Sequence, residues 1–524
     1  MIPFIHLPTV LLVIGYGVYW LELAILLHPT GHTTWFASAL FLVYAAVLAF
    51  RHMKACSFRF KPICFPRLSW ENGFWLLCGL FALVIIGVVF YASLLPPHLP
   101  QEFDAINYHI TVPRQHLLTG SFAHLPWSWA DFFLSPIDFA FTPYWLVTEL
   151  PNKFPQFFFF AALPLLAVSL ARRAGAQQPW LAAVLILGLH GLMIQGGTAM
   201  LDIVLCYLCI AAIEAFLAGH SILAAIEAGF FVFGKPMLPI FAALLVLGML
   251  LIVLLVRPKR WLLGFKAGES GVGDWRPRAR AFLVSFAVAG LVCAGPFMLK
   301  SFFYTGTPFF PVGVGIFKPI ITPAPGFQEK MKAVSDQYIS TRNTYGLPRN
   351  AGNFLAHFWL IAVPDKGVNN RFDYPLGLPI VLMIGPFVFF LTRAIGCKQF
   401  PVLPVLCVAS WILWWFGSQQ SRFLFVPAVL MMVTTVAMLD KGSRILRGCL
   451  VVACGFTAMS VCRAHAADFG KTSLQVLRQE DRMLVDRAAN VQPGARVAVY
   501  SSNMAFAAFV VDVRAGDSMF VIKQ

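Results

Sequence analysis

Apolar runs long enough to cross a bilayer are the feature that most constrains this fold. About thirteen of them recur along the 524 residues, and most approach the roughly 20 residues that a helix needs to span the hydrocarbon core. The runs are 3–27, 35–50, 72–95, 154–170, 180–199, 202–217, 222–234, 237–256, 281–300, 375–392, 401–416, 423–439 and 445–461. Inside a bilayer every backbone polar group must be paired, and a helix achieves this within its own segment. The sequence therefore predicts an all-α polytopic membrane protein with about 13 transmembrane helices.

The composition excludes a soluble or disordered chain. Hydrophobic residues make up 59% and charged residues only 12%, whereas a soluble domain is about one-quarter charged. The net charge of +16 would suit a nucleic-acid partner, but the basic residues gather in short loops between apolar runs, as membrane topology requires. The 11 cysteines mostly lie inside apolar runs, so neither a disulfide nor a zinc framework is expected. We therefore expect membrane lipids, and no nucleic acid, as partners.

The distribution of lysine and arginine predicts the orientation. The loops richest in these residues are 51–67, 171–179, 257–280, 393–400 and 440–447. By the positive-inside rule these loops and the N-terminus are cytoplasmic, and an odd number of spans places the C-terminus outside.

The chain divides into three expected parts. Residues 1–70 hold two N-terminal helices and a basic loop, residues 71–462 form the main membrane region, and residues 463–524 form a small extracytoplasmic segment. Two long segments of the main region face outward, 96–153 and 301–374, and we expect them to carry short helices.

The first outward segment carries the sharpest chemical signal. It reads FDAINYHITVPR over 103–114. If the chain turns helical after Asp104, then Asn107 and Tyr108 lie on the same helical face. A carboxylate, the His109 imidazole and the Arg114 guanidinium within eleven residues predict a polar pocket at the membrane surface. The alternative is that Asp104 only caps a helix.

Three further residues are expected on the same outer side. Asp202 opens an apolar run, either as a functional carboxylate or as a helix cap. Lys235 lies between two apolar runs, where it either binds an anion or snorkels toward water. Arg422 opens another run, and arginine suits phosphate recognition. With Asp104 and Arg114 included, two carboxylates and three cations are expected on one surface. This combination suits the binding of an anionic lipid headgroup beside a general base.

Three glutamates lie inside apolar runs: Glu22, Glu214 and Glu227. Acids within a membrane indicate either ion coupling in a transporter or pairing between helices. They have no basic partners nearby in sequence, and we favour pairing between helices.

The motifs, taken in order, resemble the GT-C membrane glycosyltransferases. This superfamily includes bacterial relatives of the protein O-mannosyltransferases and of the lipid A aminoarabinose transferases. The resemblance covers about residues 75–435. It rests on the acidic loop 103–114 ending near Gly120, Met200-Leu201-Asp202, Gly234-Lys235-Pro236, the element Tyr304–Pro311 and the Arg-containing entry Ser421–Pro427. Two extra spans precede the usual first one, which is why residues 1–70 are set apart.

The resemblance implies a GT-C-like fold and an activity. The expected enzyme is a glycosyltransferase (hexosyl- or pentosyltransferase) that moves a sugar from a polyprenyl-phosphate donor to an acceptor hydroxyl on a lipid, glycan or protein. Its site faces the extracytoplasmic side of the plasma (inner) membrane. A transporter or flippase, or a polysaccharide polymerase, for lipid-linked glycans is the alternative.

The resemblance also implies roles for individual residues. Asp104 takes the proton of the acceptor hydroxyl, and Asp202 holds the acceptor or, together with Asp104, a divalent cation such as Mg²⁺ or Mn²⁺. The expected phosphate-binding residues are Lys235, Arg422 and Arg114. The expected substrate-binding residues are Tyr108, His109, Asn107 and Tyr304.

Overall fold

The computed structural model gives a bundle of helices. It describes residues 4–26, 31–55, 70–97, 102, 104–125, 128–145, 153–235, 238–239, 241–244, 260–262, 275–343, 345–363, 372–396, 399–438, 444–466, 469–471 and 475. Most of the predicted C-terminal segment 463–524 and most of the apolar run 237–256 lie outside these residues.

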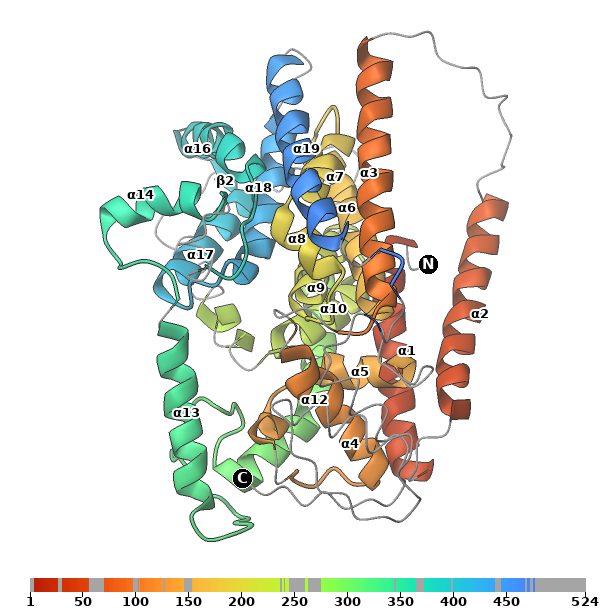
Figure 1. The fold of residues 1–524 in the computed structure, drawn as a ribbon, viewed down its shortest axis with the longest axis vertical. Coiled ribbons are helices and arrows are strands. Elements are labelled where there is room, and N and C mark those ends of the chain that lie inside the picture. Colours follow the sequence, from red (N-terminus) through yellow and green to blue (C-terminus); the bar gives the residue numbers. More distant parts are fainter. Residues whose placement is uncertain are drawn as a thin grey trace.

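Helices form nearly all of the described structure (Figure 1). The first half contains η1 (Phe4–His6), α1 (Leu7–Leu21), η2 (Glu22–Leu26), α2 (Gly31–Ala55), α3 (Trp70–Leu94), η4 (Ala105–Ile110), α4 (Thr111–Thr119), η5 (Trp129–Phe132), α5 (Pro136–Trp145), α6 (Phe154–Arg173), α7 (Trp180–Leu187), α8 (His190–Gly196), α9 (Asp202–Leu217) and α10 (Ser221–Phe233). The second half contains α12 (Trp275–Thr305), α13 (Phe327–Asn343), α14 (Ala351–Leu360), α16 (Pro379–Gly396), α17 (Val402–Phe416), η6 (Ser421–Leu424), α18 (Phe425–Met438) and α19 (Arg444–Ala466). The one departure from an all-α chain within the described residues is a parallel pair of three-residue strands, β1 (Arg260–Leu262) and β2 (Gln399–Pro401).

The centre of the bundle is α9. It packs against α6 and α10, and α10 in turn packs against α12. Small residues allow the close approach of α10 and α12, because a Cβ on Gly229 would come within 2.9 Å of the Ala289 methyl group. The N-terminal helix α1 packs against α5, and its Leu12 and Tyr19 belong to the main hydrophobic core.

Among the described residues, four helices are long and apolar enough to cross a membrane. They are Phe4–Ala24, Glu71–Leu94, Phe154–Arg173 and Pro277–Thr305, and five shorter apolar helices accompany them. Two of the four, on α3 and α12, expose large apolar side chains such as Leu83 at 69% and Leu291 at 74%. Such surfaces are suited to lipid and not to water. The chain is therefore a multi-pass membrane protein.

Most predicted runs correspond to helices, but one does not form a single helix. The run 180–199 is two helices, α7 and α8, because the first helix ends at Gly188 and the chain turns there. Gly188 packs directly on Cys454 of α19, where a side chain would not fit. The predicted total of about 13 transmembrane helices and the predicted orientation stay predictions.

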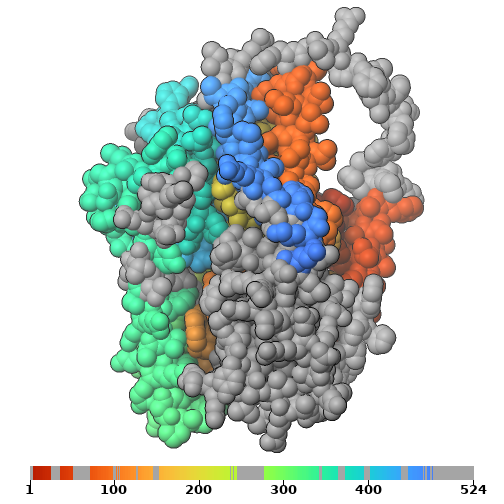
Figure 2. Space-filling model, viewed as in Figure 1, coloured from red at the N-terminus to blue at the C-terminus, as the bar shows by residue number. Residues whose placement is uncertain are grey.

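The long segments between spans carry short helices. Segment 96–153 holds η4, α4, η5 and α5, and segment 301–374 holds α13 and α14. Figure 1 shows α13 at one side of the molecule, away from the central bundle. Figure 2 shows α3 and α19 side by side on the face in view, in agreement with their contacts.

A candidate active site at the end of α9

The first outward segment is helical after Asp104, as the sequence predicts, but its beginning is a π-helix. Residues Ala105–Ile110 form η4, and α4 follows directly and ends at Gly120. Gly120 adopts the left-handed conformation (φ 59°), which glycine reaches without steric cost. The wider turn of η4 changes the helical register between His109 and His116, so the two imidazoles have different partners.

Asp104 is not a side-chain helix cap. Its carboxylate makes no capping hydrogen bond, and its Oδ2 lies 3.7 Å from Nη1 of Arg422. Arg422 belongs to η6, more than three hundred residues later, and its Nε lies 3.3 Å from Oδ2 of Asp373. Arg422 therefore has one carboxylate from the first outward segment and one from the loop before α16.

Asp202 also has a cationic partner. It is the first residue of α9, and its Oδ1 accepts a hydrogen bond of 2.5 Å from Nζ of Lys235, which follows α10. Both groups are largely buried, with side-chain exposures of 2% and 15%. Lys235 therefore does not snorkel into water. Lys235 of this ion pair and both members of the pair Asp104–Arg422 line the same space.

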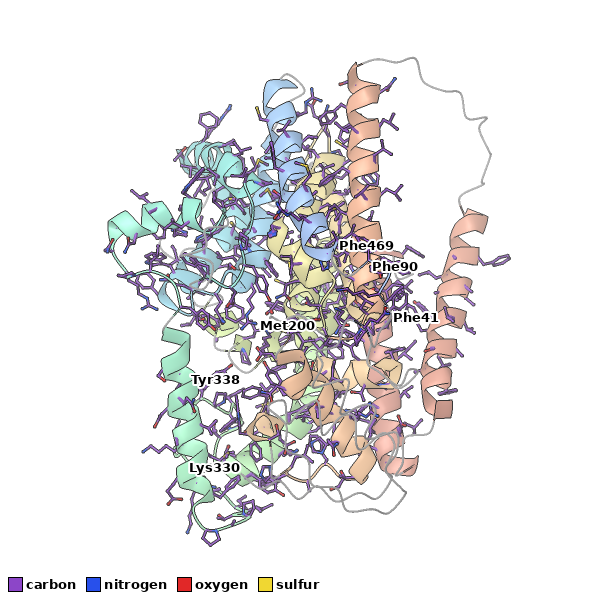
Figure 3. All side chains as sticks on the ribbon, in the orientation of Figure 1. Phe41, Phe90, Met200, Lys330, Tyr338 and Phe469 are labelled. Carbon is purple, nitrogen blue, oxygen red and sulfur yellow. The ribbon has the colours of Figure 1, made fainter. Side chains whose placement is uncertain are left out.

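This space, which we call the polar cavity, has a volume of about 330 Å³. It lies between η4, η5, α5, the end of α10, α13 and η6, and Figure 3 marks Tyr338 on α13. The residues around it are Asp104, Asn107, Tyr108, His109, Trp129, Phe133, Leu134, Ser135, Asp138, Gly234, Lys235, Val334, Gln337, Tyr338, Tyr345, Gln420, Arg422 and Phe423.

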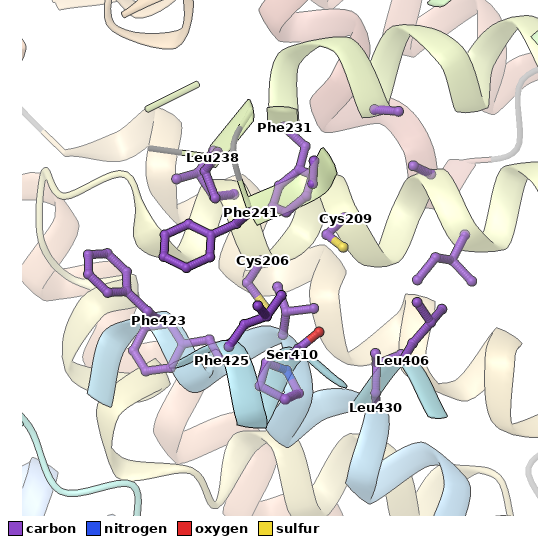
Figure 4. Close-up of a pocket in the computed structure, with 18 of the residues that line it drawn as sticks. Cys206, Cys209, Phe231, Leu238, Phe241, Leu406, Ser410, Phe423, Phe425 and Leu430 are labelled. Atoms are coloured by element: carbon purple, nitrogen blue, oxygen red, sulfur yellow. The ribbon is translucent and has the colours of Figure 1, made fainter. Parts of the chain in front are cut away.

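A second and larger space, the apolar cavity, adjoins it. Its volume is about 690 Å³, and its walls come mainly from α9, α10, α12, α17 and α18. Figure 4 shows its apolar side chains, among them Cys206, Phe231 and Leu430. Lys235, Arg422 and Phe423 line both cavities. The two cations therefore stand where a polar space meets an apolar one.

A buried imidazole–carboxylate pair lies in the wall of the polar cavity. Nδ1 of His109 is 2.9 Å from both carboxylate oxygens of Asp138 on α5. The two side chains are 3% and 1% exposed. Burial raises the pKa of Asp138, while the neighbouring His109 acts against that rise. Burial likewise raises the pKa of Tyr108, well above its usual range.

The structure brings together most of the residues predicted for the site. Asp104, Asn107, Tyr108, His109, Lys235 and Arg422 line the polar cavity, and Asp202 lines the apolar cavity and is bonded to Lys235. Arg114 is buried and lines neither cavity. Tyr304 packs against Phe132 and His124 in an aromatic cluster beside the polar cavity, but it lines neither cavity. The chemical roles assigned to these residues stay predictions.

Two carboxylates of the site were missed by the sequence interpretation. Asp138 lies on α5 and reaches the cavity only through the fold of the first segment. Asp373 lies in a short loop with φ of 71°, an uncommon conformation for a residue other than glycine. Burial raises the pKa of Asp373, although Arg422 acts in the opposite direction. No pattern in the sequence around either residue marks it.

The predicted divalent cation does not fit the pairing of the two carboxylates. Asp202 is bonded to Lys235 and Asp104 faces Arg422, so each acid already has a cationic partner. Among the described residues, no group of three or more His, Cys, Asp and Glu side chains is arranged to hold a metal ion. The metal role of Asp104 and Asp202 stays a prediction, and the chemistry proposed below uses no metal ion.

Comparison with known proteins gives a likeness at the level of structure. No family model and no curated protein matches the sequence. ArnT from Cupriavidus metallidurans bound to undecaprenyl phosphate has 13% identity and a TM-score of 0.51, over 85% of this chain and 85% of that chain. The apo state of ArnT from Cupriavidus metallidurans has 12% identity and a TM-score of 0.48, over 87% of each chain. The predicted resemblance is therefore confirmed at the level of the fold, which this chain shares with ArnT from Cupriavidus metallidurans.

Proposed function

We propose that this protein is an integral-membrane glycosyltransferase that takes a sugar from a polyprenyl-phosphate donor and transfers it to an acceptor hydroxyl. The observation that carries the proposal is the position of Lys235 and Arg422 in the walls of both cavities. A polyprenyl-phosphate sugar has an apolar chain, a phosphate and a polar sugar in that order. The apolar cavity, the two cations and the polar cavity follow in the same order.

The charges at the junction suit an exchangeable anion. Lys235 and Arg422 are surrounded by the three carboxylates of Asp202, Asp104 and Asp373. In a site largely removed from water, a cation gains more from a phosphate than it would at the surface. When the donor binds, its phosphate would replace carboxylate partners of these cations. When no donor is bound, the ion pairs hold the cations in place.

The reaction needs a proton acceptor and stabilisation of a leaving phosphate. The acceptor oxygen attacks the anomeric carbon, the bond from that carbon to the phosphate oxygen breaks, and polyprenyl phosphate leaves with the electron pair. Lys235 and Arg422 stabilise the charge that grows on the phosphate. The sequence interpretation gives the hydroxyl proton to Asp104, which lines the polar cavity.

The structural neighbour supports the class of lipid. ArnT from Cupriavidus metallidurans was solved with undecaprenyl phosphate bound, and its fold is shared by 85% of this chain. We propose that the site faces the extracytoplasmic side of the plasma (inner) membrane, as the loop charges predict. We leave open which hexose or pentose is moved and whether the acceptor is a lipid, a glycan or a protein.

The donor site is tested by lipid binding to the purified protein in nanodiscs, with undecaprenyl phosphate as the probe. Lys235→Met is expected to weaken binding by about 10–100-fold, since a hydrogen bond to a charged group contributes about 1.5–3 kcal/mol. The matched control is Lys300→Met, because Lys300 also lies 2.5 Å from an aspartate, Asp131, but lines neither cavity. Equal binding by wild type and Lys235→Met contradicts the phosphate assignment.

The transfer reaction is tested in proteoliposomes that contain a membrane lipid extract as acceptor. A panel of polyprenyl-phosphate hexoses and pentoses serves as donor, and release of polyprenyl phosphate is measured. Asp104→Asn is expected to slow release by about 10²–10⁴-fold while the protein stays inserted and abundant. Movement of the lipid-linked sugar across the bilayer, with no new glycosidic bond, would support the transporter alternative instead.

A further inference from the structure

The imidazole of His109 is held in one orientation. Its Nδ1 lies 2.9 Å from both oxygens of Asp138, so this nitrogen donates its hydrogen to the carboxylate. In the neutral ring, Nε2 then carries the lone pair. A carboxylate on one ring nitrogen fixes the tautomer and stabilises the imidazolium that forms if the other nitrogen takes a proton.

The second ring nitrogen has no protein partner. Nε2 of His109 is buried and makes no hydrogen bond within the described part of the chain. A buried polar atom left without a hydrogen-bond partner destabilises the folded protein. His109 lines the polar cavity together with Asp104, Lys235 and Arg422. The missing partner of Nε2 is therefore expected from a ligand in that cavity.

A similar pair seven residues later shows what a fully paired histidine looks like in this fold. His116 is also buried and also contacts an aspartate, with 2.6 Å from Nε2 to Oδ1 of Asp131. Its Nδ1 donates to the carbonyl of Ser121 at 2.8 Å, and Lys300 lies 3.0 Å from Nε2. Both ring nitrogens of His116 are occupied, and the residue lines neither cavity. His109 differs in having one nitrogen left for a ligand.

We propose that His109, oriented by Asp138, accepts the proton of the acceptor hydroxyl during sugar transfer. This inference rests on the proposed function and changes one assignment within it. As the acceptor oxygen bonds to the anomeric carbon, its proton passes to Nε2, and polyprenyl phosphate leaves with the electron pair of the broken bond. His109 later returns the proton to water. Asp104, whose carboxylate is held toward Arg422, orients the hydroxyl.

The charges around His109 come from several elements. Asp138 approaches from α5, Asp104 and Tyr108 from its own segment, Lys235 from the end of α10 and Arg422 from η6. Asp202, on α9, is close enough to act on His109 electrostatically. The two cations oppose a charged imidazole before the reaction, and Asp138 supports it once the proton arrives.

The test compares His109→Gln with His116→Gln in the proteoliposome assay. We expect His109→Gln to lower kcat for release of polyprenyl phosphate by about 10²–10⁴-fold, the usual contribution of a general base. Undecaprenyl phosphate should bind with a Kd within about twofold of wild type. The rise of kcat with pH on the acid side should persist in Asp104→Asn and vanish in His109→Gln. His116→Gln should retain both kcat and the pH profile in the folded fraction.

Two further variants keep the test independent of folding. Added imidazole should restore part of the activity of His109→Ala by occupying the vacated space, which a structural role does not allow. Asp138→Asn should lower kcat by at least about tenfold, because the amide no longer supports the imidazolium. If the rise of kcat with pH on the acid side persists in His109→Gln and vanishes in Asp104→Asn, then Asp104 is the proton acceptor and the proposal is overturned. Donor binding lost together with activity, with no rescue by imidazole, also overturns it.

The outcome for the wild-type protein separates the two proposals. Wild type that binds undecaprenyl phosphate but releases none from any donor of the panel overturns the transferase itself, and the role of His109 falls with it. Wild type that transfers sugar while His109→Gln does so at a similar rate and pH dependence overturns only the role of His109.

Discussion

The two ends of α9 carry clusters of similar chemistry with different surroundings. At one end Asp202 bonds to Lys235 beside the two cavities. Near the other end Glu214 belongs to a closed cluster, whose members are His6, Thr9, Ser169, Arg173, Glu214 and Glu227. None of these six residues lines either cavity.

The closed cluster joins the elements η1, α1, α6, α9 and α10, and His6 bridges its two glutamates. His6 lies 2.7 Å from Glu227 of α10 and 3.1 Å from Glu214 of α9, and Arg173 of α6 lies 3.0 Å from Glu214. Glu214 and Glu227 therefore pair between helices, as favoured from the sequence. The comparison teaches that a buried charge in this protein does not by itself mark a site. What distinguishes the Asp202 end is space beside the charges.

The largest expected difference between the two ends concerns their arginines. Arg422→Ala is expected to lower kcat/KM for sugar transfer by about 10²–10³-fold, since it removes a group that stabilises the leaving phosphate. Arg173→Ala removes an arginine that is one-third exposed and pairs with Glu214, so transfer by the folded protein should change less than about twofold. The measurement is the initial rate of polyprenyl phosphate release per folded molecule. Equal losses of transfer rate in both variants would show that the two ends of α9 do not differ in function.

A smaller effect is expected at the closed cluster, and on stability instead of activity. Glu227 accepts hydrogen bonds from His6 and from Thr9, each 2.7 Å long. Glu227→Gln keeps the shape but weakens both bonds, so the free energy of unfolding should fall by about 1.5–3 kcal/mol. Thermal unfolding in nanodiscs measures the loss, and Glu71→Gln, whose carboxylate is 60% exposed, is the control. A loss of transfer activity at unchanged stability would place function at this end as well.

The sequence predicts the positions of the helices more completely than it predicts the residues of the site. Apolar runs predict helices because a lipid environment imposes length and composition on each segment locally. Asp202, Lys235 and Arg422 could be found because each stands at the boundary of an apolar run, where a charge is conspicuous, and Asp104 because it opens a polar motif in the segment after such a run. Their pairing into two ion pairs depends on how the helices pack, which no local pattern encodes.

The residues that sequence reasoning missed depend on conformation. In a regular α-helix a spacing of seven residues would place His109 and His116 on one face, but the π-helix η4 changes their relative direction. Asp138 gains its importance only from contact with His109, and Asp373 only from a backbone turn that brings it to Arg422. His6 is more than two hundred residues from Glu214 and Glu227 in sequence, yet it contacts both in the structure.

The smallest expected effect is a pH dependence at the cluster of His116, Asp131 and Lys300. Burial lowers the pKa of His116, and Lys300 adds to this while Asp131 opposes it. The unfolded chain therefore binds a proton at this histidine as the pH falls through about 6.5, before the folded protein does, so stability declines with acidification. Burial acts to raise the pKa of Asp131, but His116 and Lys300 lower it overall, so this carboxyl titrates below that range.

Between about pH 7.5 and pH 5.5 the melting temperature of wild type should therefore fall more than that of His116→Gln. The contribution of His116 to the free energy of unfolding should change by at most about 1.4 kcal/mol per pH unit. Parallel curves for the two proteins would mean that His116 keeps the same protonation in the folded and unfolded chain, and the distinction between a paired and an available histidine would then rest on the activity of His109 alone.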